Sequence, residues 1–107
     1  MKNIKDVDIK SAIRSRSRLI ESLSETEAEN IRSIADSMAT CLASGGTVYT
    51  CGNGGSASQA EHFSAELVGR FYKDRRSLPV YSLSENGAVL SSLANDYSFD
   101  NVFSHQI

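Results

Sequence analysis

The fold is decided by ten consecutive residues in the middle of the chain, Thr47-Val48-Tyr49-Thr50-Cys51-Gly52-Asn53-Gly54-Gly55-Ser56. The first five are β-branched, aromatic or small, and they predict a short strand. The next five are rich in glycine. Beyond them the apolar residues recur every three or four positions, at Ala60, Phe63, Leu67 and Phe71. We therefore expect a strand, a tight glycine loop and a helix from Ser56 to Phe71.

The residues after this helix repeat the pattern of strand and helix. Leu78–Leu83 predicts a second strand, with Pro79 only at its entry. A short helix is predicted over 88–94, an interruption over 95–98, and the start of a further helix over 99–107. Strands that alternate with helices favour a parallel sheet covered by helices. The fold class is therefore α/β.

Two helices are predicted before the first strand. The apolar residues of 6–23 recur at helical spacing along one narrow stripe. Thr26 and Glu29 have the spacing of a capping box at the start of a second helix, and Gly45-Gly46 supplies its stop. We expect an αα-hairpin around residues 24–25. The domain prediction is a helical hairpin for packing or oligomerisation over 1–45, followed by the α/β part over 46–107.

Composition excludes several classes of protein. The 107 residues are 40% hydrophobic and 22% charged, with a net charge of −2. A nucleic-acid binder usually carries a basic excess, and no apolar run approaches the ~20 residues that span a bilayer. The first residues lack the apolar core of a signal peptide, so we expect a cytoplasmic protein. Cys41 and Cys51 match neither a CxxC site nor a disulfide scaffold, and we expect two buried, reduced thiols.

The glycine loop is the first candidate site. Glycines allow consecutive backbone amides to turn inward, and the new helix adds free amides and the positive end of its dipole. Such a place suits a phosphate. A plain turn would need only one or two glycines. Gly52-x-Gly54-x-x-Ala57 formally fits a dinucleotide fingerprint, but no acidic residue ends the second strand. A small phosphorylated metabolite is the leading ligand, and a dinucleotide is the second.

His62 and Glu66 are the second candidate. They are four residues apart and so lie on one face of the predicted helix. Such a pair can share a metal ion or transfer protons, or can form a simple surface hydrogen bond. Their closeness to the glycine loop favours a role in a site.

Asn95-Asp96 is the third candidate, because ligands of open α/β sheets bind beyond the carboxyl ends of the strands. An Asx turn between two helices accounts for Asn95 equally well.

These segments resemble one known family in consecutive order. The chain is similar to the phosphoheptose isomerases of the sugar-isomerase (SIS) superfamily at Gly52-Asn53-Gly54-Gly55-Ser56, His62-Phe63-Ser64-Ala65-Glu66-Leu67, Gly69-Arg70-Phe71, Leu78-Pro79 and Ala94-Asn95-Asp96-Tyr97. The resemblance implies a three-layer, parallel-sheet, flavodoxin-like SIS fold preceded by the helical hairpin. It also implies a cytoplasmic homotetramer.

The family's reaction converts sedoheptulose 7-phosphate to D-glycero-D-manno-heptose 7-phosphate, toward the heptose of lipopolysaccharide. By resemblance, Asn53, Gly54, Gly55 and Ser56 would bind the seven-carbon sugar phosphate, as would Asn95 and Asp96. His62 and Glu66 would line the site and hold one zinc ion. Glu66 would be the base that moves a proton between C1 and C2 through an enediol.

The family pattern continues beyond this sequence. A second phosphate loop, and a C-terminal helix whose Gln and His complete the metal shell, have no counterpart in the 107 residues. We therefore expect the first part of a SIS domain, cut short at its C-terminus, with its remaining zinc ligands outside this chain and little activity alone. The alternative is a non-catalytic SIS protein that binds a sugar phosphate or associates with a replication initiator. In the known scaffold of that kind the catalytic glutamate is missing, whereas Glu66 is present here.

Overall fold

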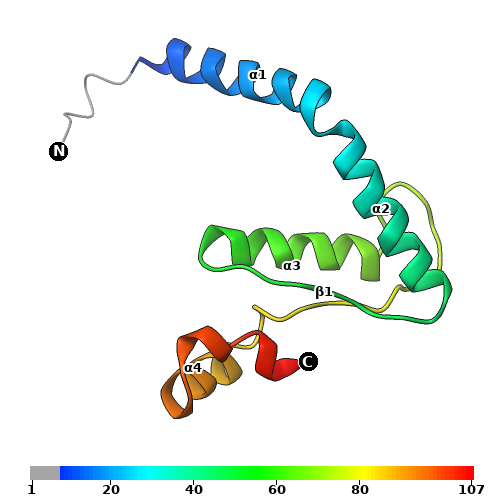
Figure 1. Cartoon of the computed structure of the whole chain (residues 1–107), viewed down its shortest axis with the longest axis vertical. Helices are drawn as coiled ribbons and strands as arrows, with labels where there is room; N and C mark the ends of the chain where they lie inside the picture. The colour runs from blue at the N-terminus through cyan, green and yellow to red at the C-terminus, as the bar shows by residue number, and fades with distance from the viewer. Residues whose placement is uncertain (1–7) are drawn as a thin grey trace. The chain divides into compact units, whose positions relative to one another are not determined.

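The computed structural model describes residues 8–107, which divide into two compact units at the junction of Ser37 and Met38. The elements follow in the order α1 (Ile9–Thr26), α2 (Ala28–Ala43), β1 (Val48–Thr50), α3 (Gly55–Val68), β2 (Val80–Ser82), α4 (Gly87–Asp96) and two 3₁₀ turns, η2 (Phe99–Asn101) and η3 (Ser104–Gln106) (Figure 1).

The first unit is helical. Asp8 caps α1, since its carboxylate accepts a hydrogen bond of 3.2 Å from the amide of Ser11. The capping box predicted at Thr26 is wrong. Thr26 is instead the last residue of α1, and its hydroxyl donates to the carbonyl of Ser22. Only Glu27 separates α1 from α2, whereas helical hairpins usually have a connection of about two to five residues. The hairpin and its boundary at residue 45 stay predictions.

The predicted stop of α2 is confirmed at the two glycines. Gly45 has a φ of +84°, in the left-handed region that glycine adopts without strain. Its amide donates to the carbonyl of Leu42, and the amide of Gly46 donates to that of Cys41 at 2.8 Å. These two bonds are those of a Schellman motif. Gly46 also has no room for a side chain, because a Cβ there would lie 2.6 Å from Sγ of Cys41.

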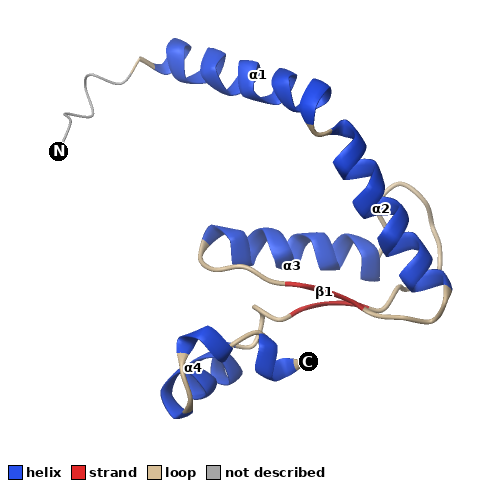
Figure 2. Ribbon diagram, viewed as in Figure 1, coloured by secondary structure: helices blue, strands red, loops and turns tan. Residues whose placement is uncertain are grey.

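The predicted parallel sheet is confirmed. β1 and β2 pair in parallel, with Val48 opposite Val80 and Thr50 opposite Ser82. The helix α3 connects them and packs on both strands. Figure 2 shows α3 on one side of the two strands, and α4 with the C-terminal turns on the other. The architecture is an α/β fold with two parallel strands, and it places the glycine loop at the carboxyl end of β1.

The core lies between the sheet and its helices and is small. Its buried apolar residues are Ala60, Val80, Leu83 and Val102, and it also buries the hydroxyls of Ser64, Ser82 and Ser84. By contrast, no residue of α1 or α2 is buried. On α3, Phe63 is 48% exposed, and Phe71 just beyond it is 61% exposed. Large apolar side chains of the helices therefore lie uncovered in the described part of the chain.

The C-terminal part differs from its prediction. The interruption predicted over 95–98 begins two residues later than expected, because Asn95 and Asp96 form the last turn of α4, which ends with the amide of Tyr97 bonded to the carbonyl of Leu93. The helix predicted over 99–107 is wrong, since the segment forms two 3₁₀ turns. The side chain of Gln106 donates to the carbonyls of Val102 and Leu83, at 2.7 and 2.9 Å. These bonds hold the segment against the end of β2, with Val102 buried beneath it.

Two further findings concern expectations from composition. Among residues 8–107, none of the helices is long and apolar enough to cross a membrane. Both cysteines are free, but the expectation that both are buried is wrong, because Cys51 is exposed and Cys41 is half-buried.

Candidate functional site

The glycine loop turns the chain from β1 into α3 over Gly52–Gly54. Gly54 is the N-cap of α3 with a φ of +57°, and it has no side chain with which to cap the helix. The turn is closed by the amide of Ser56, which donates to the carbonyl of Asn53 at 3.0 Å. Gly52 must be a glycine, since a Cβ there would lie 2.5 Å from the backbone of Ser56. No side chain caps this helix N-terminus, and the positive end of the helix dipole there favours an anion.

Ser84 fixes this loop to the second strand, a role that sequence reasoning missed. Its hydroxyl accepts a hydrogen bond of 2.9 Å from the amide of Gly52 and donates one of 2.8 Å to the carbonyl of the same residue. Its own amide donates to the hydroxyl of Ser82. Because Ser84 is buried and Gly52 is half-buried, both bonds are partly shielded from water. In the sequence Ser84 looks like the first residue of a turn, and nothing there signals the bond.

The orientation of α3 is set by a buried hydroxyl pair. Thr50, at the end of β1, donates to the carbonyl of Ala60 at 2.9 Å, and its hydroxyl lies 2.7 Å from that of Ser64. Ala60 and Ser64 therefore face the sheet. His62 follows Ala60 by two residues, and Glu66 follows Ser64 by two. Each is therefore rotated about 200° around the helix axis from that residue. They lie on the opposite face, away from the strands.

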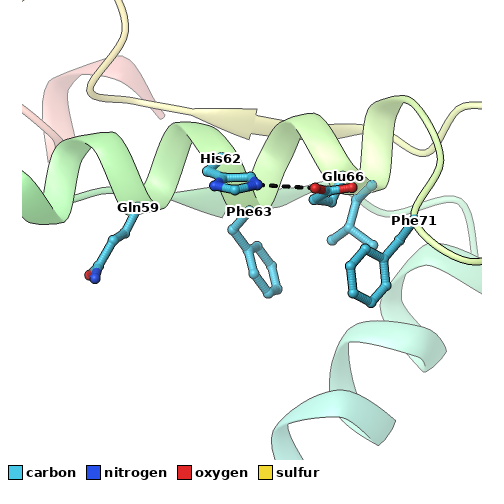
Figure 3. A pocket seen from close by; sticks show the side chains of 6 residues that line it. Gln59, His62, Phe63, Glu66 and Phe71 are labelled. Carbon is cyan, nitrogen blue, oxygen red and sulfur yellow. Dashed lines mark hydrogen bonds and ion pairs between the residues drawn. The ribbon is translucent and has the colours of Figure 1, made fainter. Parts of the chain in front are cut away.

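On that outer face His62 and Glu66 are in contact, as the sequence predicts. Nε2 of His62 lies 3.0 Å from Oε1 of Glu66, and the two side chains are 76% and 36% exposed (Figure 3). The carboxylate is therefore the more enclosed of the two. An imidazole beside a carboxylate can pass protons or hold a cation between them.

The pair lies in a groove along α3. A cavity of about 420 Å³ is lined by Gln59, His62, Phe63, Glu66, Leu67 and Phe71, whose side chains project to the same side of the helix (Figure 3). The apolar members stand beside the polar pair, so a ligand in this groove would meet both an aromatic wall and a carboxylate. Such a mixture is typical of small-molecule sites.

Asn95 and Asp96 lie elsewhere, in the last turn of α4. The amide of Asn95 donates to the carboxylate of Asp96 at 3.2 Å, and both residues are exposed. The groove on α3 is not lined by either of them, nor by residues 53–56. The structure thus brings His62 and Glu66 together and holds the glycine loop in shape. It leaves Asn95-Asp96 as a separate polar pair.

The donor set on α3 fits part of a zinc site. Imidazole nitrogen and carboxylate oxygen are both common zinc ligands, and zinc usually takes about four. Within residues 8–107, no group of three or more His, Cys, Asp or Glu side chains stands close enough to hold a metal ion. His62 and Glu66 therefore offer two ligands, and a complete shell requires others.

Most of the chain matches the model of one known protein family. The model of the SIS domain matches residues 13–107. Curated relatives include the phosphoheptose isomerase of Geotalea daltonii, which is 41% identical over 100 residues covering 94% of this chain and 52% of the relative. The phosphoheptose isomerase of Shewanella halifaxensis is 48% identical over 84 residues, covering 78% of this chain and 43% of its own.

Solved structures agree with this comparison. A phosphoheptose isomerase from Neisseria gonorrhoeae superposes with a TM-score of 0.83 at 33% identity, over 92% of this chain and 50% of the other. One from Francisella tularensis gives a TM-score of 0.86 at 32% identity, over 92% and 51%. The chain spans about half the length of the relatives that it matches.

Proposed function

The chain belongs to the SIS-domain family, where it matches the N-terminal portion of the phosphoheptose isomerases, and from this premise we propose an aldose–ketose isomerase of phosphorylated seven-carbon sugars. The reaction would convert sedoheptulose 7-phosphate to D-glycero-D-manno-heptose 7-phosphate. The proposal concerns a protein in which this chain is joined to the second half that its relatives have.

The contact between Glu66 and His62, on the helix that follows the glycine loop, is the observation that supports this proposal most strongly. Glu66 supplies a carboxylate within 3.0 Å of an imidazole, in a groove of about 420 Å³. Carboxylates near such partners are common general bases. A protein that only bound the sugar phosphate would have no need of a base in this groove.

The chemistry assigned to Glu66 is a proton transfer between neighbouring carbons. Its carboxylate removes a proton from C1 of the ketose, the C–H electron pair forms the C1=C2 bond, and the C2 carbonyl oxygen takes up a proton. The enediol then returns to a carbonyl at C1: the O1 hydroxyl loses its proton and C2 gains one. Substrate and product are isomers, so no other reactant is consumed. His62 orients the carboxylate during these transfers.

We assign substrate binding to the glycine loop and to the pair Asn95-Asp96. Asn53, Gly54, Gly55 and Ser56 would contact the substrate at the N-terminus of α3, which no side chain caps and where a negative charge is favoured by the helix dipole. Asn95 and Asp96 would hydrogen-bond the sugar hydroxyls, which requires α4 and the groove to meet at one ligand in the assembled protein. Further phosphate contacts would come from the family's second half.

A zinc ion is proposed at the same pair. His62 and Glu66 would be two of its ligands, with the others outside this chain. Bound there, the ion would polarise the sugar's oxygens and so make the neighbouring carbon more acidic. The residues of this chain would then hold the ion and present the carboxylate.

The family also suggests a setting for the reaction. We propose a cytoplasmic homotetramer that acts in the synthesis of heptose for lipopolysaccharide. Uncovered apolar faces on α1 and α3 support association with further protein surface.

The test is to measure the formation of the aldose from sedoheptulose 7-phosphate, with and without added zinc. The full protein is expected to turn over, and residues 1–107 alone are expected to be inactive or nearly so. Calorimetry with the same sugar phosphate measures binding separately. Binding without turnover in the full protein would favour a sugar-phosphate-binding SIS protein. Capture of a replication initiator with no sugar-phosphate binding would favour the scaffold.

A further inference from the structure

Arg75 occupies an unusual position in the charged segment between α3 and β2. Its neighbours from Phe71 to Asp74 are exposed, as is Arg76, whereas Arg75 is half-buried. Its guanidinium reaches back beneath the end of α3. Nη2 donates to the carbonyl of Glu66 at 3.0 Å, and Nη1 lies 2.9 Å from the carbonyl of Leu67. Nη1 also lies 3.0 and 3.1 Å from the carbonyls of Gly69 and Arg76.

These bonds satisfy carbonyls that a helix end otherwise leaves open. The last four carbonyls of an α-helix have no partner within the helix. In α3 the carbonyl of Ala65 accepts from the amide of Gly69 at 2.9 Å, and that of Leu67 also accepts from the amide of Leu78. The carbonyl of Glu66 accepts its hydrogen bond from the guanidinium of Arg75. The charge of Arg75 also suits the negative end of the helix dipole.

The residue held in this way is the proposed base itself. The last turn of α3 has no basic residue of its own and ends at Gly69, the residue type that least resists fraying. If this turn opened, the Cα of Glu66 would move relative to His62, one turn earlier. The contact between the two side chains depends on an intact turn.

We propose that Arg75 is a positioning residue, which clamps the last turn of α3 and thereby holds the carboxylate of Glu66 beside His62. The catalytic part of this inference rests on the proposed function, whereas the clamp itself does not. A planar guanidinium with several donors can serve two or more carbonyls together, and a lysine ammonium cannot match that geometry.

The experiment compares wild type with Arg75→Gln, Arg75→Lys and a matched control, Arg76→Gln. Arg76 is the exposed neighbour, so its replacement removes the same charge without the clamp. The first readout is amide hydrogen exchange at Gly69 and Leu78. The second is the NOE between the His62 ring and the Glu66 side chain. The third readout is the pair of steady-state constants kcat and KM, determined separately in the full protein.

In Arg75→Gln we expect exchange at Gly69 and Leu78 to quicken about tenfold, the NOE to weaken, and kcat to fall at least about tenfold with little change in KM. Arg75→Lys should not fully restore the exchange rates, the NOE or kcat to their wild-type values. Arg76→Gln should equal wild type in all three. Exchange and NOE unchanged in Arg75→Gln would overturn the clamp, as would full rescue by lysine. A quickened exchange with unaltered kcat would overturn the positioning role.

A failure of the proposed function can be distinguished from a failure of the clamp. If the full wild-type protein shows no isomerisation, that function is lost, and the exchange and NOE results still decide whether Arg75 clamps the turn that carries Glu66.

Discussion

Nε2 of His62 lies 3.0 Å from Oε1 of Glu66, one helical turn further along α3. The contact stands on the face of α3 turned away from the sheet, because Thr50 fixes Ala60 and Ser64 against β1. A carboxylate with one defined partner, in a groove rather than in the core, is free to meet a ligand.

Removing the carboxylate should abolish turnover and leave the fold intact. Glu66→Gln keeps the shape of the side chain but cannot accept the proton from C1. We expect kcat to fall by about 10²- to 10⁴-fold, the usual loss for a general base, with an unchanged circular dichroism spectrum. Glu61→Gln on the same helix is the matched control, and a comparable loss there would show that the effect is one of surface charge.

Zinc affinity should depend on the same two residues. Calorimetric titration of the full protein with zinc should show weaker binding in His62→Gln and in Glu66→Gln. Even outer-shell partners of zinc are worth about 10- to 100-fold, so the loss of a ligand should cost at least as much. His105→Gln, at the chain's other histidine, should bind as wild type does. Equal affinity in all variants would place the metal elsewhere.

Loss of the hydroxyl of Ser84 should loosen the glycine loop. Ser84→Ala removes both bonds to Gly52 and leaves its half-buried amide and carbonyl unpaired. We expect the free energy of unfolding to drop by about 1–3 kcal/mol, measured by urea denaturation, and sugar-phosphate affinity to weaken. In the control, Ser91→Ala, the lost bonds are exposed and lie within α4, so little change is expected. Equal effects of the two substitutions would contradict the role of Ser84.

A side chain at Gly52 should displace the loop. Gly52→Ala sets a Cβ 2.5 Å from the backbone of Ser56, where no flexible group can move aside. We expect the loss of sugar-phosphate binding by calorimetry and a destabilisation of at least about 1 kcal/mol. Gly87→Ala is the comparison, since nothing lies within 4 Å of a Cβ there. Wild-type affinity in Gly52→Ala would show that the loop does not carry the phosphate.

The sequence predicts the elements that depend on local chemistry. The change of period at Thr47, the glycines at 52–55 and the double glycine at 45–46 identify β1, the loop and the end of α2. The spacing of His62 and Glu66 predicts their contact. These features are formed by residues that are close in sequence, so the hydrophobic pattern and the propensities of the residues are sufficient to predict them.

Features that depend on distant partners could not be predicted in this way. Arg75 and Ser84 sit in segments that look like solvated turns, and their roles appear only when the chain brings α3 and the glycine loop to them. The 3₁₀ turns at the C-terminus depend on Gln106, whose side chain takes the carbonyl of Val102 that an α-helix would give to its amide. At Thr26 the hydroxyl bonds back within α1, so that helix continues through the predicted cap.

The central claim is that Glu66 moves a proton between C1 and C2, and isotope exchange tests it most directly. The full protein is incubated with sedoheptulose 7-phosphate in D₂O, and deuterium at C1 of the ketose and C2 of the aldose is followed by NMR. We predict incorporation with wild type and none above background with Glu66→Gln. Equal incorporation or equal turnover by Glu66→Gln would contradict the assignment of Glu66 as the base.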